Sequence, residues 1–201
     1  MKVSEAVKIT GSMTQTSKMP GLSYSLPAWE CQVGAKLRTV KGSVCSGCYA
    51  LKGNYTRYPA IKAAQYYRLQ SLYNPQWIPA MVAQIKRQKY FRWHDAGDLQ
   101  SVQHLKNIFE VCNRTPGTKH WLPTREVRYT RLMDPAIVPT NLKIIISDHM
   151  IDQKTPVKSW PYTSGVSTKS ATCPAPSQGG KCGSCRQCWD RNVARVVYGK
   201  H

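Results

Sequence analysis

Eight cysteines constrain this chain of 201 residues more than any other feature, because seven of them fall into two groups near its opposite ends. The groups are Cys31, Cys45 and Cys48, then Cys173, Cys182, Cys185 and Cys188, with Cys112 standing apart. The N-terminal sequence lacks a signal peptide's apolar region, and no run approaches ~20 apolar residues. We therefore expect a cytoplasmic protein that does not enter a membrane. Thiols stay reduced in that compartment, so the clustered cysteines predict metal ligands rather than disulfides.

The first group contains half of a typical metal site, in the stretch "SVCSGCY" at residues 43–49. Two residues separate Cys45 from Cys48, and Cys31 lies upstream. Three thiolates would hold a cubane [4Fe–4S] cluster with one iron open to a small molecule, whereas a fourth thiolate would close the cluster. Zinc held by four thiolates is the structural alternative. A merged site, in which two tail cysteines join Cys45 and Cys48, is a further alternative.

The second group has the pattern C-x8-C-x2-C-x2-C, within "TCPAPSQGGKCGSCRQCWD". Three cysteines at intervals of three are typical of ferredoxin loops, where short turns bring several sulfurs to one cluster. A four-thiolate zinc site fits the same residues. Lys181, Arg186 and Arg191 lie in or next to this segment, so it could also contact a polyanion.

Periodic patterns predict strands alternating with helices through the middle of the chain. Strand-like runs lie at 21–27, 89–94, 119–124 and 142–147, and helical patterns at 59–72, 75–85 and 101–112. Cys112 lies on the apolar stripe of the last helix, where a buried core thiol is expected. This alternation predicts an α/β fold with a mostly parallel sheet.

The chain divides, by composition, into an α/β metal-binding domain at 1–152 and a Cys-rich extension at 153–201 that packs on it. The extension is rich in Pro, Gly, Ser and Thr, with a strand expected near 162–167. Residues 190–198 are predicted to form a closing helix, with Val193, Val196 and Val197 facing inward.

Polar side chains follow three of the predicted strands. They are His94, Asp95, Asp98, Arg125 and Ser147. Because the carboxyl ends of parallel strands share one edge of a sheet, these groups should meet there. We take the first four as candidate catalytic residues. Ser147 and Tyr49, which follows Cys48, are candidates for contacting a cofactor. Helix capping and turn formation are the structural alternative for Asp98 and Ser147.

The charge of the chain is strongly positive and unevenly distributed. Lys and Arg number 29 against 10 Asp and Glu, for a net charge of +19, and residues 31–93 contain no acidic residue. Such a field attracts polyanions, so a nucleic acid or nucleotide is the expected partner. Tyrosines among these cations could stack on bases. The alternative is a protein that is simply basic, with tyrosines at the rim of its core.

Two segments resemble a known family. "VCSGCYALKGNY" and "FRWHDAGDLQSVQHL" resemble the phage gene-product-eighty-eight domain family, over roughly residues 20–150. The Cys-rich tail resembles that of some members only. The resemblance implies a protein of a bacteriophage or mobile element, acting in the host cytoplasm, and implies no particular reaction.

The order of features also resembles radical S-adenosylmethionine enzymes. That resemblance implies a partial (β/α) barrel in which Cys31, Cys45 and Cys48 hold the cluster. Gly97 and Asp98 would then face the amino group of S-adenosylmethionine. The sequence departs from that pattern where thirteen residues separate Cys31 from Cys45, and where Asp98 replaces a glutamate.

Two hypotheses follow. The first is a phage-type iron–sulfur protein with a radical-enzyme-like partial barrel and a basic surface, with zinc at the tail cysteines as a variant. The second is a metal-stabilised nucleic-acid-binding module without catalysis.

Overall fold

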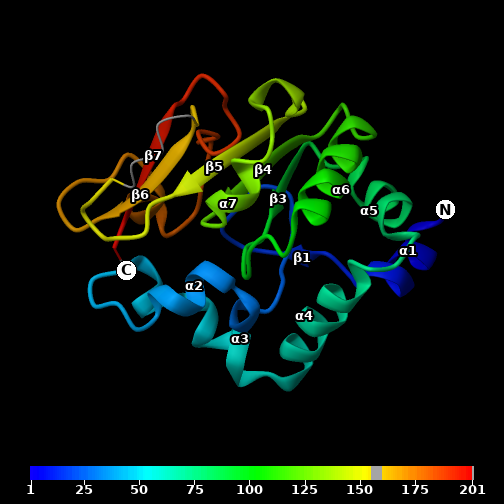
Figure 1. The fold of residues 1–201 in the computed structure, drawn as a ribbon, viewed down its shortest axis with the longest axis horizontal. Helices are drawn as coiled ribbons and strands as arrows, with labels where there is room; N and C mark the ends of the chain where they lie inside the picture. Colours follow the sequence, from blue (N-terminus) through cyan, green and yellow to red (C-terminus); the bar gives the residue numbers. More distant parts are fainter. Residues whose placement is uncertain (155–159, 201) are drawn as a thin grey trace.

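A seven-stranded sheet organises the molecule, and its strands lie side by side in the order in which they occur along the chain (Figure 1). The computed structural model describes residues 1–154 and 160–200. The strands are β1 (Thr14–Gln15), β2 (Leu22–Tyr24), β3 (Tyr90–Trp93), β4 (Lys119–Thr124), β5 (Leu142–Ser147), β6 (Thr163–Ser167) and β7 (Arg195–Gly199). β1 is antiparallel to β2, and each later neighbouring pair is parallel. The predicted α/β class and mostly parallel sheet are confirmed; the sheet is open, with β1 and β7 at its ends.

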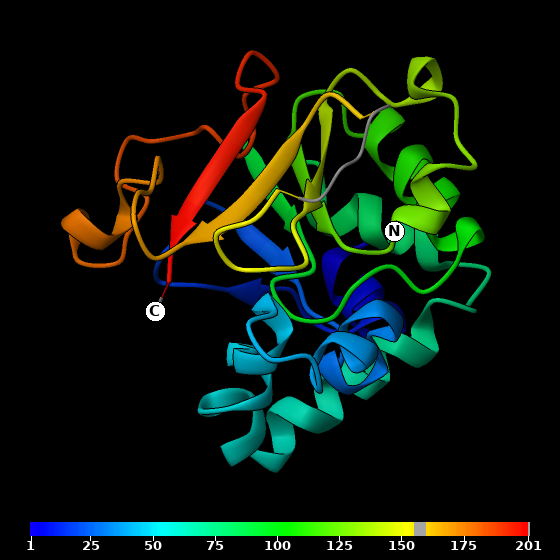
Figure 2. The ribbon, with the colours of Figure 1, turned by 60° about the vertical axis from the view of Figure 1, so that its left-hand side comes forward.

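The helices form two groups. α2, α3 and α4 lie together, apart from α5 and α6 (Figures 1 and 2). The helices are α1 (Val3–Thr10), α2 (Gln32–Leu37), α3 (Asn54–Arg57), α4 (Pro59–Ser71), α5 (Trp77–Ile85), α6 (Val102–Asn113) and α7 (Val127–Thr130). Short 3₁₀ turns lie at Ala28–Glu30, Val44–Gly47, Tyr49–Leu51, Pro135–Ile137 and Ala175–Gln178. Of the described residues, none belongs to a helix long and apolar enough to cross a membrane.

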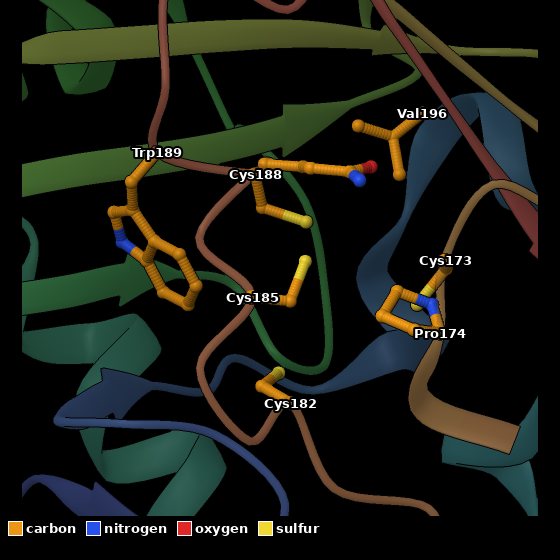
Figure 3. Close-up of a pocket in the computed structure, with 8 residues that line it drawn as sticks. Cys173, Pro174, Cys182, Cys185, Cys188, Trp189 and Val196 are labelled. Atoms are coloured by element: carbon orange, nitrogen blue, oxygen red, sulfur yellow. The ribbon is translucent and has the colours of Figure 1, made fainter. Parts of the chain in front are cut away.

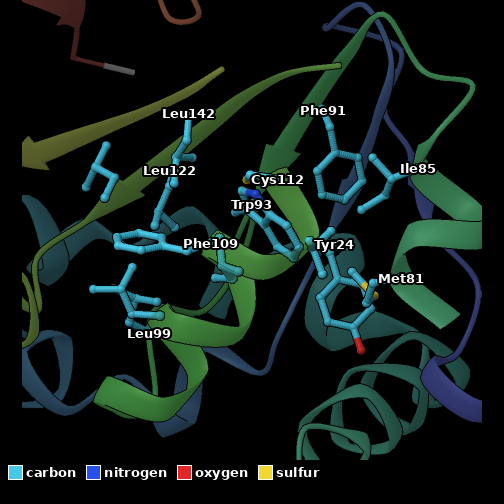
Figure 4. Close-up of a cluster of buried hydrophobic side chains, with 14 of the residues drawn as sticks. Tyr24, Met81, Ile85, Phe91, Trp93, Leu99, Phe109, Cys112, Leu122 and Leu142 are labelled. Carbon is cyan, nitrogen blue, oxygen red and sulfur yellow. The ribbon is translucent and has the colours of Figure 1, made fainter. Parts of the chain in front are cut away.

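The main core lies between one face of the sheet and the helices α5 and α6, and we call this the helix face (Figure 4). Strand side chains alternate between faces, so Phe91 and Trp93 of β3 point into this core together with Leu122 of β4. α6 begins at Ser101, whose hydroxyl accepts from His104 N at 3.0 Å and caps the helix. Cys112 is 0% exposed within this core, as its apolar stripe predicted.

The opposite face of the sheet is covered by the C-terminal segment, and we call it the tail face. Trp121 and Ile145, which alternate with the helix-face residues of β4 and β5, form a second buried cluster with Trp189. Every residue of β5 is buried, as its continuous apolar run predicted for a strand covered on both sides.

The closing helix predicted at 190–198 is wrong, because Arg195–Gly199 is the strand β7. β7 pairs in parallel with β6, the strand that was expected near 162–167. The spacing of Val193, Val196 and Val197 fits a helix, but β-branched residues favour a strand wherever a neighbouring strand offers its backbone. β6 offers that edge, so β7 extends the sheet.

Candidate metal centre

The loop after β3 is fixed by backbone contacts with the chain that follows β2. His94 N donates to Tyr24 O at 3.0 Å, and Leu26 N donates to Ala96 O at 2.8 Å. Gly97 has φ +79°, and a Cβ there would lie 2.6 Å from Leu26 Cβ and 2.7 Å from Leu26 O. Only glycine fits this conformation and this close approach. The loop therefore presents Asp98 at one fixed place at the carboxyl ends of the strands.

Asp98 is buried and accepts three hydrogen bonds. Its Oδ1 accepts from Thr124 Oγ1 at 2.6 Å and from Leu99 N at 2.8 Å, and its Oδ2 accepts from Arg125 N at 2.9 Å. Burial raises the pKa of Asp98 to about 6, although these hydrogen bonds lower it. Asp98 therefore joins the ends of β3 and β4, which is the turn role that the sequence left open for it.

The cysteine-bearing segment docks on this edge through two further contacts. Val44 N donates to His149 O at 2.9 Å, just beyond the end of β5. Glu126, which follows β4, accepts from Gln32 N at 3.1 Å and from Val33 N at 2.8 Å through its Oε1. A carboxylate at the first turn of a helix is favourable, so Glu126 anchors the start of α2 next to Cys31.

Two tyrosines tie the same segment to the loop after β3. Tyr55 Oη donates to Asp95 Oδ2 at 3.0 Å, and Tyr49 Oη donates to the backbone oxygen of Asp95. Asp95 is 2% exposed, and its Oδ1 has no hydrogen-bond partner among the described residues. Tyr49, the predicted cofactor contact, thus holds the cysteine loop in place through its hydroxyl. Its ring remains exposed.

The thiols of Cys31, Cys45 and Cys48 are neighbours at this edge. Burial raises the pKa of the Cys31 thiol, and the Asp98 carboxylate raises it further. The thiols of Cys48 and Cys45 act on Cys31 in the same sense. Burial also raises the pKa of Cys45, while Arg125 lowers it. We call these three cysteines, with Asp98 and Arg125, the edge site.

Gly34 leaves space between two of these sulfurs. A Cβ at Gly34 would lie 3.8 Å from Sγ of Cys31 and 3.8 Å from Sγ of Cys45. It would also lie 2.9 Å from Cys31 Cβ, closer than real Cβ contacts come. A cluster or metal on these thiols would use the room that a larger residue would fill, and three thiolates are the donor set of an iron–sulfur cluster. The donor types of the edge site and the room beside Gly34 therefore match such a group, although the described side chains are not arranged around a metal ion in this structure.

Not every predicted residue faces the edge site. The His94 ring packs against His104 of α6, with centroids 5.2 Å apart, and neither of its buried nitrogens has a hydrogen-bond partner in the described part of the chain. Burial, helped by His104 and Arg92, holds the His94 pKa well below its usual value. Ser147 Oγ accepts from Ser164 Oγ at 3.3 Å, between β5 and β6. Arg125 remains at the edge and donates to Asp148 O from Nε, at 3.2 Å.

The four tail cysteines line a separate pocket, shown in Figure 3. We call Cys173, Cys182, Cys185 and Cys188 the tail site. Burial raises the pKa of Cys188 to about 11, although Tyr198 and Arg92 lower it. Burial also raises the pKa of Cys182, to which Cys173 and Cys185 add. The structure therefore groups Cys45 and Cys48 with Cys31, and groups the tail cysteines with one another.

No three His, Cys, Asp or Glu side chains in residues 1–154 and 160–200 are arranged to hold a metal ion. Four residues around the two sites were not singled out from the sequence. They are Gly34, Glu126, Arg92 and Lys143. Only Lys143 carried a usable signal, as a lone cation inside the apolar run "LKIIIS".

Comparison with known proteins gives one match. The model of a family described as Gene product 88 matches residues 2–191, which include both groups of cysteines. No curated protein and no solved structure matches the chain.

Proposed function

We propose that this chain, which belongs to the gene product 88 family, holds an iron–sulfur cluster on Cys31, Cys45 and Cys48. One iron would remain open to a small molecule, because three thiolates leave a cubane cluster one free position. The observation that supports this proposal is the edge site itself. Segments distant in sequence bring three thiols together beside a carboxylate and a guanidinium, with Gly34 leaving room between two sulfurs.

The charged groups of the edge site suit a ligand with both an ammonium and a carboxylate group. Asp98 Oδ1 accepts two hydrogen bonds and Oδ2 accepts one, which leaves one lone pair of Oδ2 for a ligand N–H. Arg125 supplies the opposite charge near Cys45. S-adenosylmethionine carries both groups on its methionine part. We therefore propose it as the small molecule, bound at the open iron, and a radical-enzyme relative as the class of protein.

The strand order supports the same proposal. β2 to β7 follow one another in the sheet without a reversal, and the main helical layer covers one face. Doubly wound sheets reverse their strand order and carry helices on both faces, whereas (β/α) barrels add each strand next to the last. An open partial barrel is the proposal that this order favours. Barrel enzymes place their chemistry at the carboxyl ends of the strands, where the edge site lies.

Anaerobic reconstitution tests the cluster. We expect a brown protein with about four iron and four sulfide at the edge site and the EPR signal of a reduced cubane cluster. Cys31→Ser should lower the edge-site iron, whereas Cys112→Ser, at a thiol buried in the main core, should leave it unchanged. S-adenosylmethionine should perturb the EPR signal. An iron-free protein, or Cys31→Ser with unaltered iron and spectrum, would overturn the proposal.

A second candidate function is nucleic-acid binding, favoured by one surface. Exposed cations and tyrosines occur along α3, α4 and the residue between them, where residues 54–71 include no acid. They are Arg57, Tyr58, Lys62 and Tyr67. Cations track phosphates and aromatic rings stack on bases, so this surface suits a single strand.

Salt-dependent binding separates the two candidates. Arg57→Gln with Lys62→Gln should flatten the slope of log affinity against log salt by about two phosphate contacts. Lys106→Gln with Arg114→Gln removes two exposed cations, one from α6 and one from its C-cap, and serves as the matched control. Equal slopes for the two double variants would exclude this surface as the nucleic-acid site.

A further inference from the structure

The tail site combines two stretches of chain in one pocket. Cys182, Cys185 and Cys188 come from a single loop, and Cys173 comes from the segment that leaves β6 (Figure 3). Cys185 N donates to Cys182 O at 2.9 Å, which closes the turn between the first two cysteines of the loop. Cys173 N donates to Val197 O of β7 at 3.0 Å. Four thiols from two stretches of chain thereby line one pocket.

The other residues that line the pocket offer little competition as ligands. They are Pro174, Gln187, Trp189 and Val196. With no carboxylate or imidazole in the lining, the donor set consists of sulfur alone. Sulfur ligands select thiophilic centres, zinc or an iron–sulfur cluster, over magnesium or calcium.

The loop that carries these cysteines is fixed by a buried lysine. Lys143 of β5 is 1% exposed, and its Nζ donates to the backbone oxygens of Gln187, Asp190 and Val193 at 2.8, 2.7 and 2.8 Å. The three donors of one ammonium group are all used, and they gather the end of the loop at one point. Trp189 Nε1 adds a bond to Phe91 O of β3 at 2.9 Å. The sulfur positions therefore rest on the sheet and not on a free loop.

The charges around the pocket suit an anionic centre. A zinc ion or a cubane cluster with four thiolates carries a net negative charge. The positive charge of Arg92 lowers the pKa of the Cys182 and Cys188 thiols, and that of Arg186 lowers the pKa of Cys182. Arg92 has no carboxylate ion partner within the described residues, and its buried Nε makes no hydrogen bond there. Tyr198 Oη lies 3.3 Å from Cys188 Sγ and can donate to a thiolate. Such donors are the outer shell that metal–thiolate sites use.

We propose that Cys173, Cys182, Cys185 and Cys188 hold a second, closed metal centre that fixes the tail on the tail face. The metal is either one zinc ion or one cubane iron–sulfur cluster. All four of its protein ligands are cysteine thiolates. A closed centre has no position for a substrate, so its role is structural. This proposal stands apart from the edge site and does not depend on it.

Metal analysis in two sets of variants tests the proposal. The triple variant Cys31→Ser, Cys45→Ser, Cys48→Ser removes the edge thiols. After anaerobic reconstitution with iron, sulfide and zinc, it should retain about one zinc, or about four iron and four sulfide, per chain. Adding Cys185→Ser should lower that content at least ~tenfold, whereas adding Cys112→Ser should not. Zinc without sulfide and iron with sulfide distinguish the two centres.

A second measurement covers the case in which the triple variant does not fold. Cys182→Ser with Cys185→Ser in the otherwise native chain should lose the metal of the tail site and keep that of the edge site. X-ray absorption at the metal edge should show sulfur ligands at about 2.3 Å for zinc. Metal content unaltered by the tail variants, or a folded triple variant without bound metal, would overturn the proposal. The first proposal fails by a different result, namely wild-type metal no greater than that of the triple variant.

Discussion

The edge site and the tail site place similar thiols in different surroundings. At the edge site, the carboxylate of Asp98 raises the pKa of Cys31 beyond the effect of burial. At the tail site, burial raises the pKa of Cys188, but Tyr198 and Arg92 lower it. The edge has polar groups that are available to a ligand, while the tail pocket is lined by sulfur and apolar atoms. Under our two proposals, the groups around the thiols decide whether a centre is open to a ligand or closed and structural.

Acidification should give the largest change in the free energy of unfolding. The histidines responsible lie outside the Cys-rich tail. Burial holds the pKa of His104 and of His120 at about 3, below the usual 6.5, and lowers that of His94 as well. The unfolded chain binds protons below about pH 6.5 while the folded chain does not, so stability present above that pH is lost as it falls. By about pH 5, His104 and His120 should each cost about 2 kcal/mol, and His94 acts in the same direction.

Asp98 acts in the opposite direction. Its pKa of about 6 lies above the usual 3.8, so the folded state takes up this proton first and regains about 1 kcal/mol by about pH 5. Residues 160–200 contain no histidine. Urea unfolding at about pH 7.5 and pH 5, with imidazole titration followed by NMR, measures the net loss. Identical midpoints at both pH values would contradict the buried neutral histidines.

Lys143→Met should destabilise the tail site and leave the edge site intact. Loss of the ammonium group leaves three backbone oxygens without their donor, and we expect about 3 kcal/mol of destabilisation. Tail-site metal should fall while edge-site iron persists. Lys181→Met, at an exposed lysine of the same segment, is the control. Chemical unfolding with parallel metal analysis gives both readouts, and equal stability of the two variants would speak against the anchoring role.

Gly97→Ala should destabilise the loop that positions the edge site. The new Cβ would meet Leu26 at 2.6 Å in a backbone conformation of φ +79°, and we expect a cost of about 2 kcal/mol together with loss of edge-site iron. Gly117→Ala, where a Cβ meets nothing within 4 Å, is the matched control. Unfolding midpoints and iron content serve as the measurements. A variant that keeps full iron would show that the loop after β3 does not position the site.

Gly34→Ala sharpens the comparison with the smallest change in stability. Alanine favours the helix α2, which offsets its close approach to Cys31 Cβ, so the net change should stay within about 1 kcal/mol. Edge-site iron should nevertheless fall, because the methyl group lies toward two sulfurs. Gly47→Ala, which meets nothing within 4 Å, should keep its iron. Equal iron in the two variants, measured at equal stability, would remove Gly34 from the site.

The sequence predicted the sheet better than the site. The runs that became β3, β4 and β5 are short, rich in aromatic or β-branched residues and alternate with helical patterns, so local information was enough to predict them as strands. Residues 195–199 were predicted as part of a helix, but pairing with β6 makes them a strand. The local spacing of apolar residues does not show which strands will pair. The cysteines were visible by type and spacing. The packing of His94 into the core, and the room beside Gly34, depend on tertiary contacts that a single sequence does not contain.

The strand order has a consequence for how the molecule is assembled during synthesis. Because each strand pairs with the one before it, the sheet can grow as the chain emerges. Trp189 is an exception to this order of assembly. Its indole nitrogen donates to Phe91 O, on a strand synthesised almost a hundred residues earlier. Trp121 therefore lacks this cover until Trp189 has been synthesised. Cys31, Cys45 and Cys48 are synthesised well before that, so our proposals imply that the edge-site cluster can be loaded before the tail cysteines have emerged.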